Sequence, residues 1–274
     1  MGHANKALLW EDSVYPDLIV KVLDQGTVRS SRAGNTASIF GELLKIDISK
    51  GLPIMQGRKM YVQPVLGELA ALLRGPKSIE DFKRYGCNYW DSWADEHGML
   101  NLDYGNAWRD FNGIDQLKEL VNTIKNNPMD RRMLITGWRP DNLKYLSLPC
   151  CHLLYQWYVR EDKYLDMIWY QRSVDVMVGL PSDVLLAAVW TALLANDCGL
   201  VPGMINMCLG DTHIYANHGA GALEYLRQLA RLPKPPKPVP FSFVKGTTVF
   251  NFTPQMLILD EYNSGSPIKF SLNV

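Results

Sequence analysis

The sequence predicts an α+β fold, because the expected strands and helices are interspersed without a regular strand–helix–strand alternation. The composition is that of a globular protein, since 47% of the 274 residues are hydrophobic and 20% are charged. Neither an internal repeat nor a flexible linker interrupts the chain. We therefore expect residues 1–274 to form a single domain.

The N-terminal half is expected to carry helices separated by long irregular segments. Apolar residues at helical spacing indicate the helices, and Ser78 with Asp81 resembles a capping box. The first expected elements are a helix over 17–23 followed by Gly26, a polar flexible stretch over 29–36 and a strand over 38–41. After them we expect a helix over 65–73, a short helix after Ser78, a structured loop over 89–108 and a helix capped by Asp115.

The C-terminal half is richer in strands. Aromatic and β-branched residues predict strands over 131–138, 153–159 and 165–178. An apolar helix should follow Pro181 and end near Gly199; its longest apolar run is shorter than the roughly 20 residues that span a bilayer. The last expected elements are a helix over 222–230, a stiff proline-rich connector over 233–238, and strands over 244–252 and 256–259.

Charge and cysteine usage exclude several classes of function. The 28 basic and 28 acidic residues give a formal net charge of zero, whereas non-specific binding to nucleic acid or to a membrane surface needs a basic excess. The five cysteines form no CxxC pair, and the adjacent Cys150 and Cys151 cannot usually both reach one metal ion. We expect reduced thiols in a cytoplasmic protein without a metal site.

Three residues are candidates for acid–base or nucleophilic chemistry. Cys151 could supply a thiolate nucleophile if a nearby guanidinium or imidazolium lowers the pKa of its thiol; the alternative is a buried structural cysteine. Glu68 lies in an otherwise apolar helix and is either a solvated edge residue or a buried acid–base group with a raised pKa. Asp183 directly precedes the apolar run, which makes it a candidate helix N-cap.

Arginine, histidine and tyrosine residues are the candidate binding groups. Arg131 and Arg132 open an expected strand and point to opposite faces, so one of them should reach outward, into solvent or toward a partner subunit. Arg172 lies at the junction between a strand and the apolar helix, where binding residues collect. His213 and Tyr215 share one side of an extended segment, which suits two donors to one sugar hydroxyl or a half-buried structural pair.

A series of motifs runs through nearly the whole chain. They are ELAALLRG at 68–75, WDSWADE at 90–96, DRR at 130–132, LPCCH at 148–152, QRSVD at 171–175, GDTHIYANH at 210–218 and the tail over 262–274. In identity and order they resemble the motifs of the thymidylate synthase family, which includes the phage deoxycytidylate hydroxymethylases. The resemblance implies a mixed sheet packed by helices and an obligate homodimer with back-to-back sheets. It also implies a nucleoside monophosphate substrate and 5,10-methylenetetrahydrofolate as co-substrate.

By this resemblance, Cys151 adds to C6 of a pyrimidine. The expected groups for proton transfer at the base are Glu68 and Tyr104, and His152 of the nucleophile motif is also counted as catalytic. The expected folate contacts are Trp90, Asp175 and the C-terminal Val274.

The resemblance also implies how the rest of the nucleotide is held. His213 and Tyr215 would hold the sugar 3′-hydroxyl. The expected phosphate ligands are Arg172 and Ser173, Arg131 and Arg132 from the partner subunit, and Arg32 from the polar loop. That loop is one residue shorter than is usual in the family, so Arg32 matches its position less well than the others.

Asp183 is the main departure from the family pattern. Thymidylate synthases carry asparagine there, whose amide pairs with O4 and N3–H of uracil, whereas deoxycytidylate hydroxymethylases carry aspartate. A carboxylate accepts a hydrogen bond from N4 of cytosine but repels O4 of uracil. Because the positive end of a helix favours an ionised Asp183, we expect N3 of the cytosine to be protonated as C5 attacks.

The expected reaction is hydroxymethylation of dCMP for a modified phage genome, in the host cytoplasm, with water capturing an exocyclic methylene. The alternative is methylation of dCMP or dUMP in the thymidylate synthase manner, in which hydride transfer yields dihydrofolate. Trp90 and the full-length tail suit hydride transfer. Asp183 favours hydroxymethylation only because the family members known to use cytosine mostly hydroxymethylate it. A non-catalytic nucleotide- or folate-binding regulator is a third interpretation. CMP is an alternative substrate to dCMP, because no residue is assigned to reject a 2′-hydroxyl.

Overall fold

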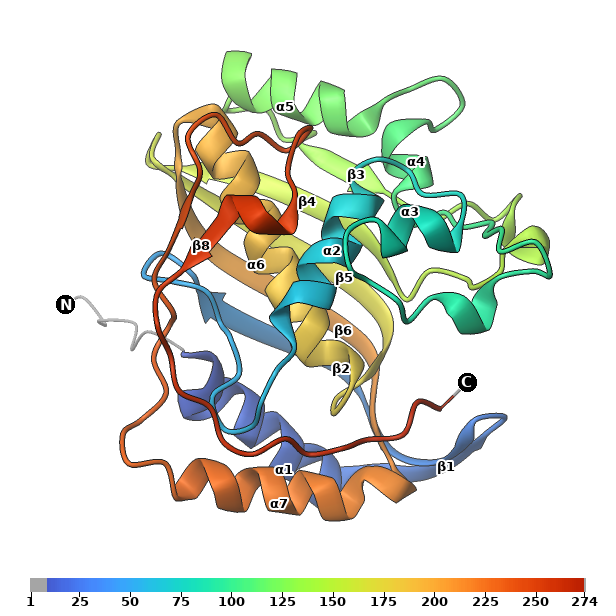
Figure 1. Cartoon of the computed structure of the whole chain (residues 1–274), viewed down its shortest axis with the longest axis vertical. Coiled ribbons are helices and arrows are strands. Elements are labelled where there is room, and N and C mark those ends of the chain that lie inside the picture. The colour runs from blue at the N-terminus through green and yellow to red at the C-terminus, as the bar shows by residue number, and fades with distance from the viewer. Residues whose placement is uncertain (1–8, 274) are drawn as a thin grey trace.

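The computed structural model describes residues 9–273, which form a mixed six-stranded sheet with helices on one face (Figure 1). The strand order is β1-β2-β6-β5-β4-β3. β5 and β6 run parallel, and the other neighbouring pairs are antiparallel. The α+β class and the mixed sheet packed by helices are confirmed.

The strands of the large sheet differ widely in length. They are β1 (Thr27–Ser31), β2 (Gly34–Asp47), β3 (Leu134–Thr136), β4 (His152–Arg160), β5 (Tyr164–Asp175) and β6 (Val201–Tyr215). A small second sheet pairs β7 (Phe241–Phe243) with β8 (Leu257–Leu259).

The helices pack on the sheet and on one another. They are α1 (Tyr15–Gln25), α2 (Val62–Leu72), α3 (Ile79–Lys83), α4 (Asn106–Arg109), α5 (Gln116–Asn126), α6 (Gly179–Cys198) and α7 (Gly219–Ala230). Shorter helical turns lie at Trp10–Val14, Asp91–Trp93, Leu143–Tyr145, Ala216–His218 and Pro254–Met256. Two expected starts are confirmed: the Ser78–Asp81 capping box of α3, and Asp115, which accepts a hydrogen bond from the Lys118 amide at α5.

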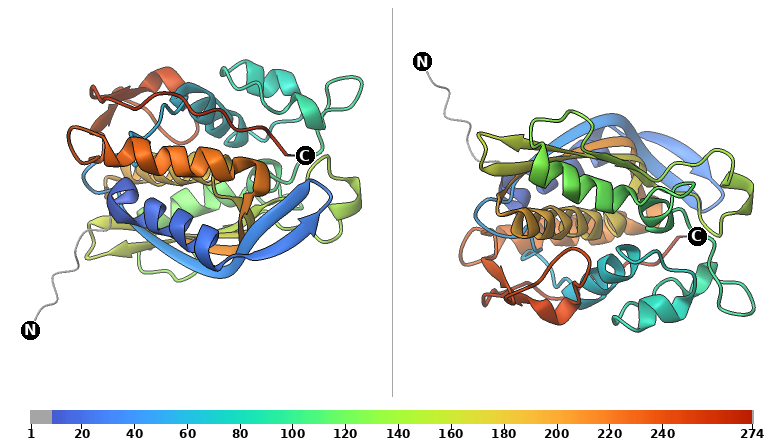
Figure 2. Two further views of the ribbon diagram at one scale, coloured as in Figure 1. Left: turned by 90° about the horizontal axis from the view of Figure 1, so that it is seen from below. Right: turned by 90° about the horizontal axis from the view of Figure 1, so that it is seen from above.

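The opposite face of the sheet is left open by the described residues (Figure 2). The strand register places Leu43, Cys208, Tyr170 and Leu154 in one row across β2, β6, β5 and β4. Leu43, Tyr170 and Leu154 are exposed. A contiguous row of exposed apolar side chains on a sheet face is typical of a protein–protein interface.

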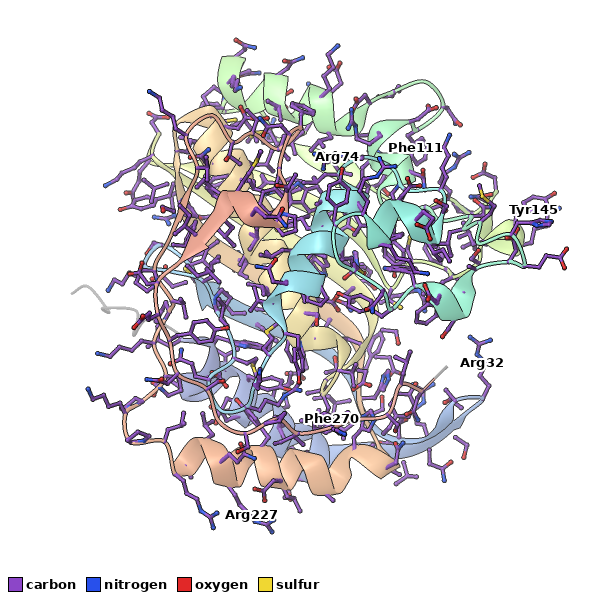
Figure 3. All side chains as sticks on the ribbon, viewed as in Figure 1. Arg32, Arg74, Phe111, Tyr145, Arg227 and Phe270 are labelled. Atoms are coloured by element: carbon purple, nitrogen blue, oxygen red, sulfur yellow. The ribbon has the colours of Figure 1, made fainter. Side chains whose placement is uncertain are left out.

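The C-terminal tail crosses the molecule beside α7 and approaches the β1–β2 hairpin, whose tip carries Arg32 (Figure 3). Phe270 anchors the tail: its ring lies 5.2 Å from the His218 ring, and the Arg58 guanidinium lies 5.0 Å from its centroid. A Cβ atom on Gly221 of α7 would come within 2.4 Å of this ring. Glycine at position 221 therefore lets the tail lie against α7.

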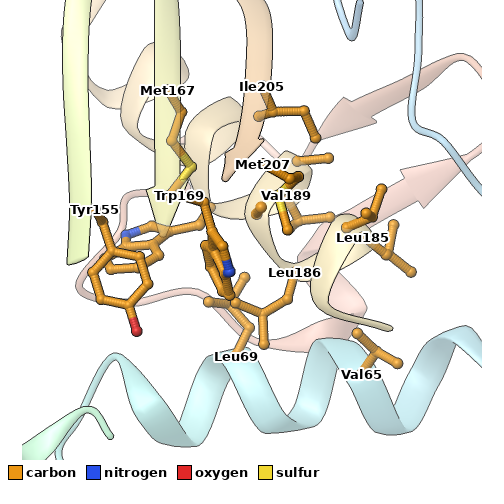
Figure 4. Packing of buried hydrophobic residues seen from close by; sticks show 14 of the residues in the cluster. Val65, Leu69, Tyr155, Met167, Trp169, Leu185, Leu186, Val189, Ile205 and Met207 are labelled. Atoms are coloured by element: carbon orange, nitrogen blue, oxygen red, sulfur yellow. The ribbon is translucent and has the colours of Figure 1, made fainter. Parts of the chain in front are cut away.

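α6 forms the centre of the core. Its residues 184–195 are all buried, and the helix packs against β5, β6 and α2 (Figure 4). Gly199 follows it in the left-handed conformation, with φ of 70°, which glycine adopts without strain. By length and composition alone α6 could cross a membrane, but 78% of its most apolar window is buried inside the protein. That is the environment of a core helix.

The largest difference from the sequence-based expectation concerns β6. The sequence predicts an extended chain for residues 211–215, whereas β6 already begins at Val201. Buried and half-buried side chains do alternate along it, with Ile205 and Met207 inward. Pro202 and Gly203, which weaken a strand prediction, obscure this short pattern.

Four other boundaries need correction. The polar stretch over 29–36 forms the β1–β2 hairpin, in which Arg29 pairs with Thr36. The strand predicted over 131–138 is reduced to β3, and the loop over 89–108 contains α4. The strand predicted over 244–252 is wrong, because these residues form turns whose apolar members Val249 and Phe252 are buried in the core. Burial of a turn produced the apolar pattern of a strand.

Candidate active site

Two adjoining cavities open where β5 and β6 end. Because these strands are parallel, their last residues lie side by side, with Ser173 beside Asp211 and Asp175 beside His213. We call the cavity of about 280 Å³ between these ends, α2 and α6 the inner chamber. The cavity of about 420 Å³ under the β1–β2 hairpin is the outer chamber. The two chambers share the residues Cys151, Ser173, His213, Tyr215 and Asn273.

Cys151 lies at the boundary between the chambers, immediately before β4. Its backbone N–H donates to the Tyr104 hydroxyl, and Nη2 of Arg172 lies 4.0 Å from its Sγ. Burial raises the pKa of the Cys151 thiol, and Arg172 and Tyr104 only partly oppose this effect. The lowered thiol pKa considered from the sequence is therefore not seen in this chain alone, and the resting group is a thiol.

Glu68 projects from α2 into the inner chamber. Nε1–H of Trp90 donates to its Oε1 at 2.9 Å, and the Tyr89 hydroxyl donates to its Oε2 at 3.2 Å. Burial raises the pKa of Glu68 to about 7, in spite of these two donors. Of the two interpretations drawn from the sequence, the buried acid–base group is the one that the structure supports.

Asp183 lies inside the first turns of α6, and the N-cap position belongs to Val178. The expected N-cap role is therefore wrong, because the helix begins at Gly179, five residues earlier than the apolar run from Val184 indicates. Nε2 of Gln171 donates to Asp183 Oδ2 at 2.7 Å. Trp169 fixes the Gln171 amide by donating Nε1–H to its oxygen at 3.0 Å. Burial raises the pKa of Asp183 to about 8, which also corrects the expected ionised state.

Tyr104 and His152 line the inner chamber together with Cys151. Their rings lie 4.5 Å apart, and Nδ1 of His152 lies 2.5 Å from the Tyr155 hydroxyl. Burial lowers the pKa of His152 to about 3. The imidazole is therefore neutral near neutral pH, and it can act only as a neutral donor or acceptor.

The outer chamber is lined by cationic and hydroxyl groups. Arg172 is fixed there by donating Nε–H to the Cys150 carbonyl at 2.7 Å. Arg32 also lines this chamber but is exposed. His213 and Tyr215 line both chambers, so the shared side expected for them is confirmed. Nδ1 of His213 lies 3.1 Å from Asp211 Oδ1, which leaves its Nε2 available to a ligand.

The folate-binding candidates Trp90 and Asp175 also line the inner chamber. Trp90, its neighbour Trp93 and Leu148 supply apolar walls, and Asp175 supplies a carboxylate. Asp175 Oδ1 accepts hydrogen bonds from the backbone amides of residues 177 and 178, which fix its orientation. Val274 lies outside the described residues.

Arg131 and Arg132 are not brought to these chambers within one chain. Both are exposed and lie in a turn that precedes β3, rather than in a strand. Strand alternation therefore does not decide where these two side chains point. Arg132 has a nearby counter-charge, since its Nη1 lies 3.8 Å from Asp130 Oδ2.

Several lining residues were not predicted as site residues. Tyr89 and Trp93 stand beside predicted Trp90, and Leu272 and Asn273 come from the tail. Arg29 forms a 2.6 Å ion pair with Asp211 in the outer chamber. The motifs at 90–96 and 210–218 were the available signal for Trp93 and Asp211. Tyr89 and Arg29 carry no signal beyond their position beside such segments.

Among residues 9–273, no group of three or more His, Cys, Asp or Glu side chains is arranged to hold a metal ion. The chemistry of the chambers instead rests on a thiol, carboxyl groups with raised pKa values and guanidinium groups.

The raised pKa values predict how stability depends on pH. In the unfolded chain, Glu68 and Asp183 release their protons at about pH 4. In the folded state they keep their protons to higher pH. The stability that they contribute is complete below about pH 4 and is lost as the pH rises through about 7 and about 8. Glu68→Gln should therefore unfold roughly 3–6 °C above the wild type at pH 8 and show a smaller difference at pH 5. Thermal unfolding across this range at constant ionic strength checks it, and parallel curves would contradict the assignment.

The class of protein follows from this arrangement. A cysteine lies where an arginine-lined chamber meets an aromatic chamber that contains titrating carboxyl groups. Such a cysteine is suited to covalent catalysis on a small anionic ring substrate.

Comparison with known proteins identifies the family. The thymidylate synthase family model matches residues 13–274. The thymidylate synthase of Enterobacteria phage T4 is 34% identical over 284 residues, covering 95% of this chain and 99% of the phage protein. The chain belongs to the thymidylate synthase family, and it is a folate-dependent enzyme that transfers one carbon to C5 of a pyrimidine nucleotide. The co-substrate of this family is 5,10-methylenetetrahydrofolate, and the family acts as a homodimer on a nucleoside monophosphate.

Proposed function

We propose that the enzyme is a deoxycytidylate hydroxymethylase, which converts dCMP, 5,10-methylenetetrahydrofolate and water to 5-hydroxymethyl-dCMP and tetrahydrofolate. The observation that carries this proposal is Asp183, a buried carboxyl group on the wall of the inner chamber that also holds Glu68 and Cys151. We place the reaction in the cytoplasm of a phage-infected host, where it would supply nucleotides for modified DNA.

Asp183 suits cytosine because a neutral carboxyl group donates to N3 and accepts from N4. N3 of cytosine is itself basic, so the shared proton can move to the ring and leave two charge-assisted hydrogen bonds to the carboxylate. O4 of uracil is a far weaker base, and the proton must then remain on Asp183. Gln171 favours the carboxylate by donating to its Oδ2. Cytosine therefore gains more from this site than uracil does.

The catalytic sequence starts at Cys151. The phosphate of the nucleotide binds in the outer chamber at Arg172 and Ser173, with Arg32 closing from the hairpin, and its negative charge is matched by these guanidinium groups. His213 and Tyr215 bind the sugar 3′-hydroxyl. Cys151 releases its proton to solvent and its sulfur adds to C6. The electrons of the C5–C6 double bond move toward C4 and N3, and the proton shared with Asp183 neutralises the charge that develops there.

The remaining groups act at C5. The folate supplies the methylene carbon, and Trp90, Trp93 and Asp175 form the part of the inner chamber that fits its flat ring and its hydrogen-bond donors. Glu68, with a pKa of about 7, is suited to accept and return protons through water at neutral pH. Tyr104 holds the backbone of the nucleophile, and His152 supports Tyr104 as a neutral ring. The tail, including Val274, would close the chamber and exclude bulk water.

We also propose that two chains pair through the open sheet face and share their active sites. The row Leu43, Cys208, Tyr170 and Leu154 supplies the apolar surface. Arg131 and Arg132, which are exposed and remote from the chambers of their own chain, would reach the phosphate of the partner subunit. These added cations would lower the pKa of Cys151 further than Arg172 does alone.

The alternative function is methylation with dihydrofolate as the second product, which Trp90 at the chamber wall favours. The absorbance change of dihydrofolate formation during turnover of dCMP separates the two reactions. We expect no such change while product accumulates; stoichiometric dihydrofolate would contradict hydroxymethylation. A non-catalytic regulator is separated from both by tritium release from 5-³H-dCMP in the presence of folate, which only an enzyme gives.

A further inference from the structure

Tyr89 is a polar side chain in the aromatic wall of the inner chamber, and the motifs of the sequence do not include it. Its hydroxyl donates to Glu68 Oε2 at 3.2 Å, while the next residue, Trp90, donates to Oε1 at 2.9 Å. Both oxygens of Glu68 are thus held by consecutive residues of one segment. Glu68 has a defined rotamer, and the hydroxyl of Tyr89 has a defined position beside it.

The other polar groups of the inner chamber have different partners. The Tyr104 hydroxyl is bound to the Cys151 amide, and the Gln171 amide is bound to Trp169 and Asp183. The Glu68–Tyr89 pair instead adjoins the Trp90 indole, whose ring lies 5.5 Å from that of Trp93, and the Cys87 thiol lies beside Tyr89. Glu68 and Tyr89 are therefore the groups on this wall with which a water molecule can form hydrogen bonds.

We propose that Tyr89 is a specificity-determining residue that directs the methylene group to water. This inference rests on the proposed hydroxymethylation, whose last step needs an ordered water at the exocyclic methylene carbon. A hydroxyl group can accept a hydrogen bond from that water while it donates to Glu68. The same wall with phenylalanine would offer the water Glu68 alone.

The step balances without any further reactant. The water oxygen forms a bond to the methylene carbon, and the electrons of the exocyclic double bond move into the ring toward C4 and N3. The proton of the water passes to Glu68. The ring electrons then return to form the C5–C6 double bond, and the Cys151 sulfur leaves C6 as a thiolate.

Tyr89→Phe tests this role with the full-length enzyme. Tritium release from 5-³H-dCMP reports the steps before capture, and mass spectrometry reports how the methylene is partitioned among water, hydride and added 2-mercaptoethanol. We expect tritium release within about threefold of the wild type, and a fall of at least about tenfold in the ratio of hydroxymethyl product to methyl product plus thiol adduct. Tyr85→Phe is the matched control, since Tyr85 lies four residues earlier and lines neither chamber.

Two results would overturn the inference while leaving the proposed function intact. One is an unchanged partition in Tyr89→Phe. The other is tritium release that falls in step with hydroxymethylation, which would make Tyr89 a support for Glu68 in all steps. A wild-type enzyme that forms only methyl product and dihydrofolate would instead overturn the proposed function itself, and the role of Tyr89 with it.

Discussion

Cys151→Ala should lower the rate of product formation by at least about a thousandfold, because among residues 9–273 no other thiol lines either chamber. Cys151 lines both chambers and lies 4.0 Å from Arg172. Tritium release from C5 should fall equally, since it depends on the same covalent addition. Steady-state turnover and tritium release, measured on the same preparations, check this result.

The adjacent cysteine provides the control. Cys150 is buried with its Sγ 3.7 Å from the Gly137 carbonyl, and it lines neither chamber. Cys150→Ala should cost about 1–2 kcal/mol of stability but keep turnover within a few-fold of the wild type. Equal loss of turnover in folded preparations of both variants would refute Cys151 as the nucleophile.

Asp183→Asn should change the preferred base from cytosine to uracil. An amide offers uracil a donor for O4 and an acceptor for N3–H, but it has no proton to give to N3 of cytosine. The ratio of kcat/KM for dCMP to kcat/KM for dUMP should fall by roughly 30- to 100-fold, which corresponds to about 2–3 kcal/mol. Competition between the two nucleotides, with product masses as the readout, measures this ratio directly.

The pH dependence of kcat/KM separates the charge of Asp183 from its shape. Both bases need the proton of Asp183, which is donated to O4 of uracil or shared with N3 of cytosine. In the wild type kcat/KM for dCMP should therefore fall as the pH rises through about 8, the pKa of Asp183 in the free site, because kcat/KM reports the ionisation of the free enzyme. Asp183→Asn has no proton to lose, and its kcat/KM for dUMP should show no such fall. A parallel fall in both proteins would assign the effect to another group.

The sequence predicted which residues meet at the site better than it predicted the bounds of the strands. The motifs place Cys151, Glu68 and Asp183 in one reaction, and the structure brings all three to the inner chamber. The sequence did not correctly predict the protonation state of Asp183. A helix N-terminus predicted an ionised Asp183, but the pKa depends on burial by elements far apart in the chain, and burial exceeds the influence of the helix.

The misassigned elements have a related cause. Val249 and Phe252 have the apolar pattern of a strand because tertiary packing buries a turn. The alternation in β6 is interrupted at its start by Pro202 and Gly203, which its parallel neighbour β5 tolerates. Tyr89 shows the same limit at the site, because only the folded chain brings its hydroxyl to Glu68. Contacts of long sequence separation are decided by packing, which a local pattern does not contain.

One measurement tests most directly whether the inner chamber selects cytosine and delivers the methylene to water. The wild-type enzyme is given dCMP, dUMP or CMP with 5,10-methylenetetrahydrofolate, and the masses of the nucleotide products are measured by mass spectrometry. We expect dCMP to be converted fastest and to gain the mass of one CH₂O unit. A product heavier by only one CH₂ unit, or faster conversion of dUMP, would contradict it.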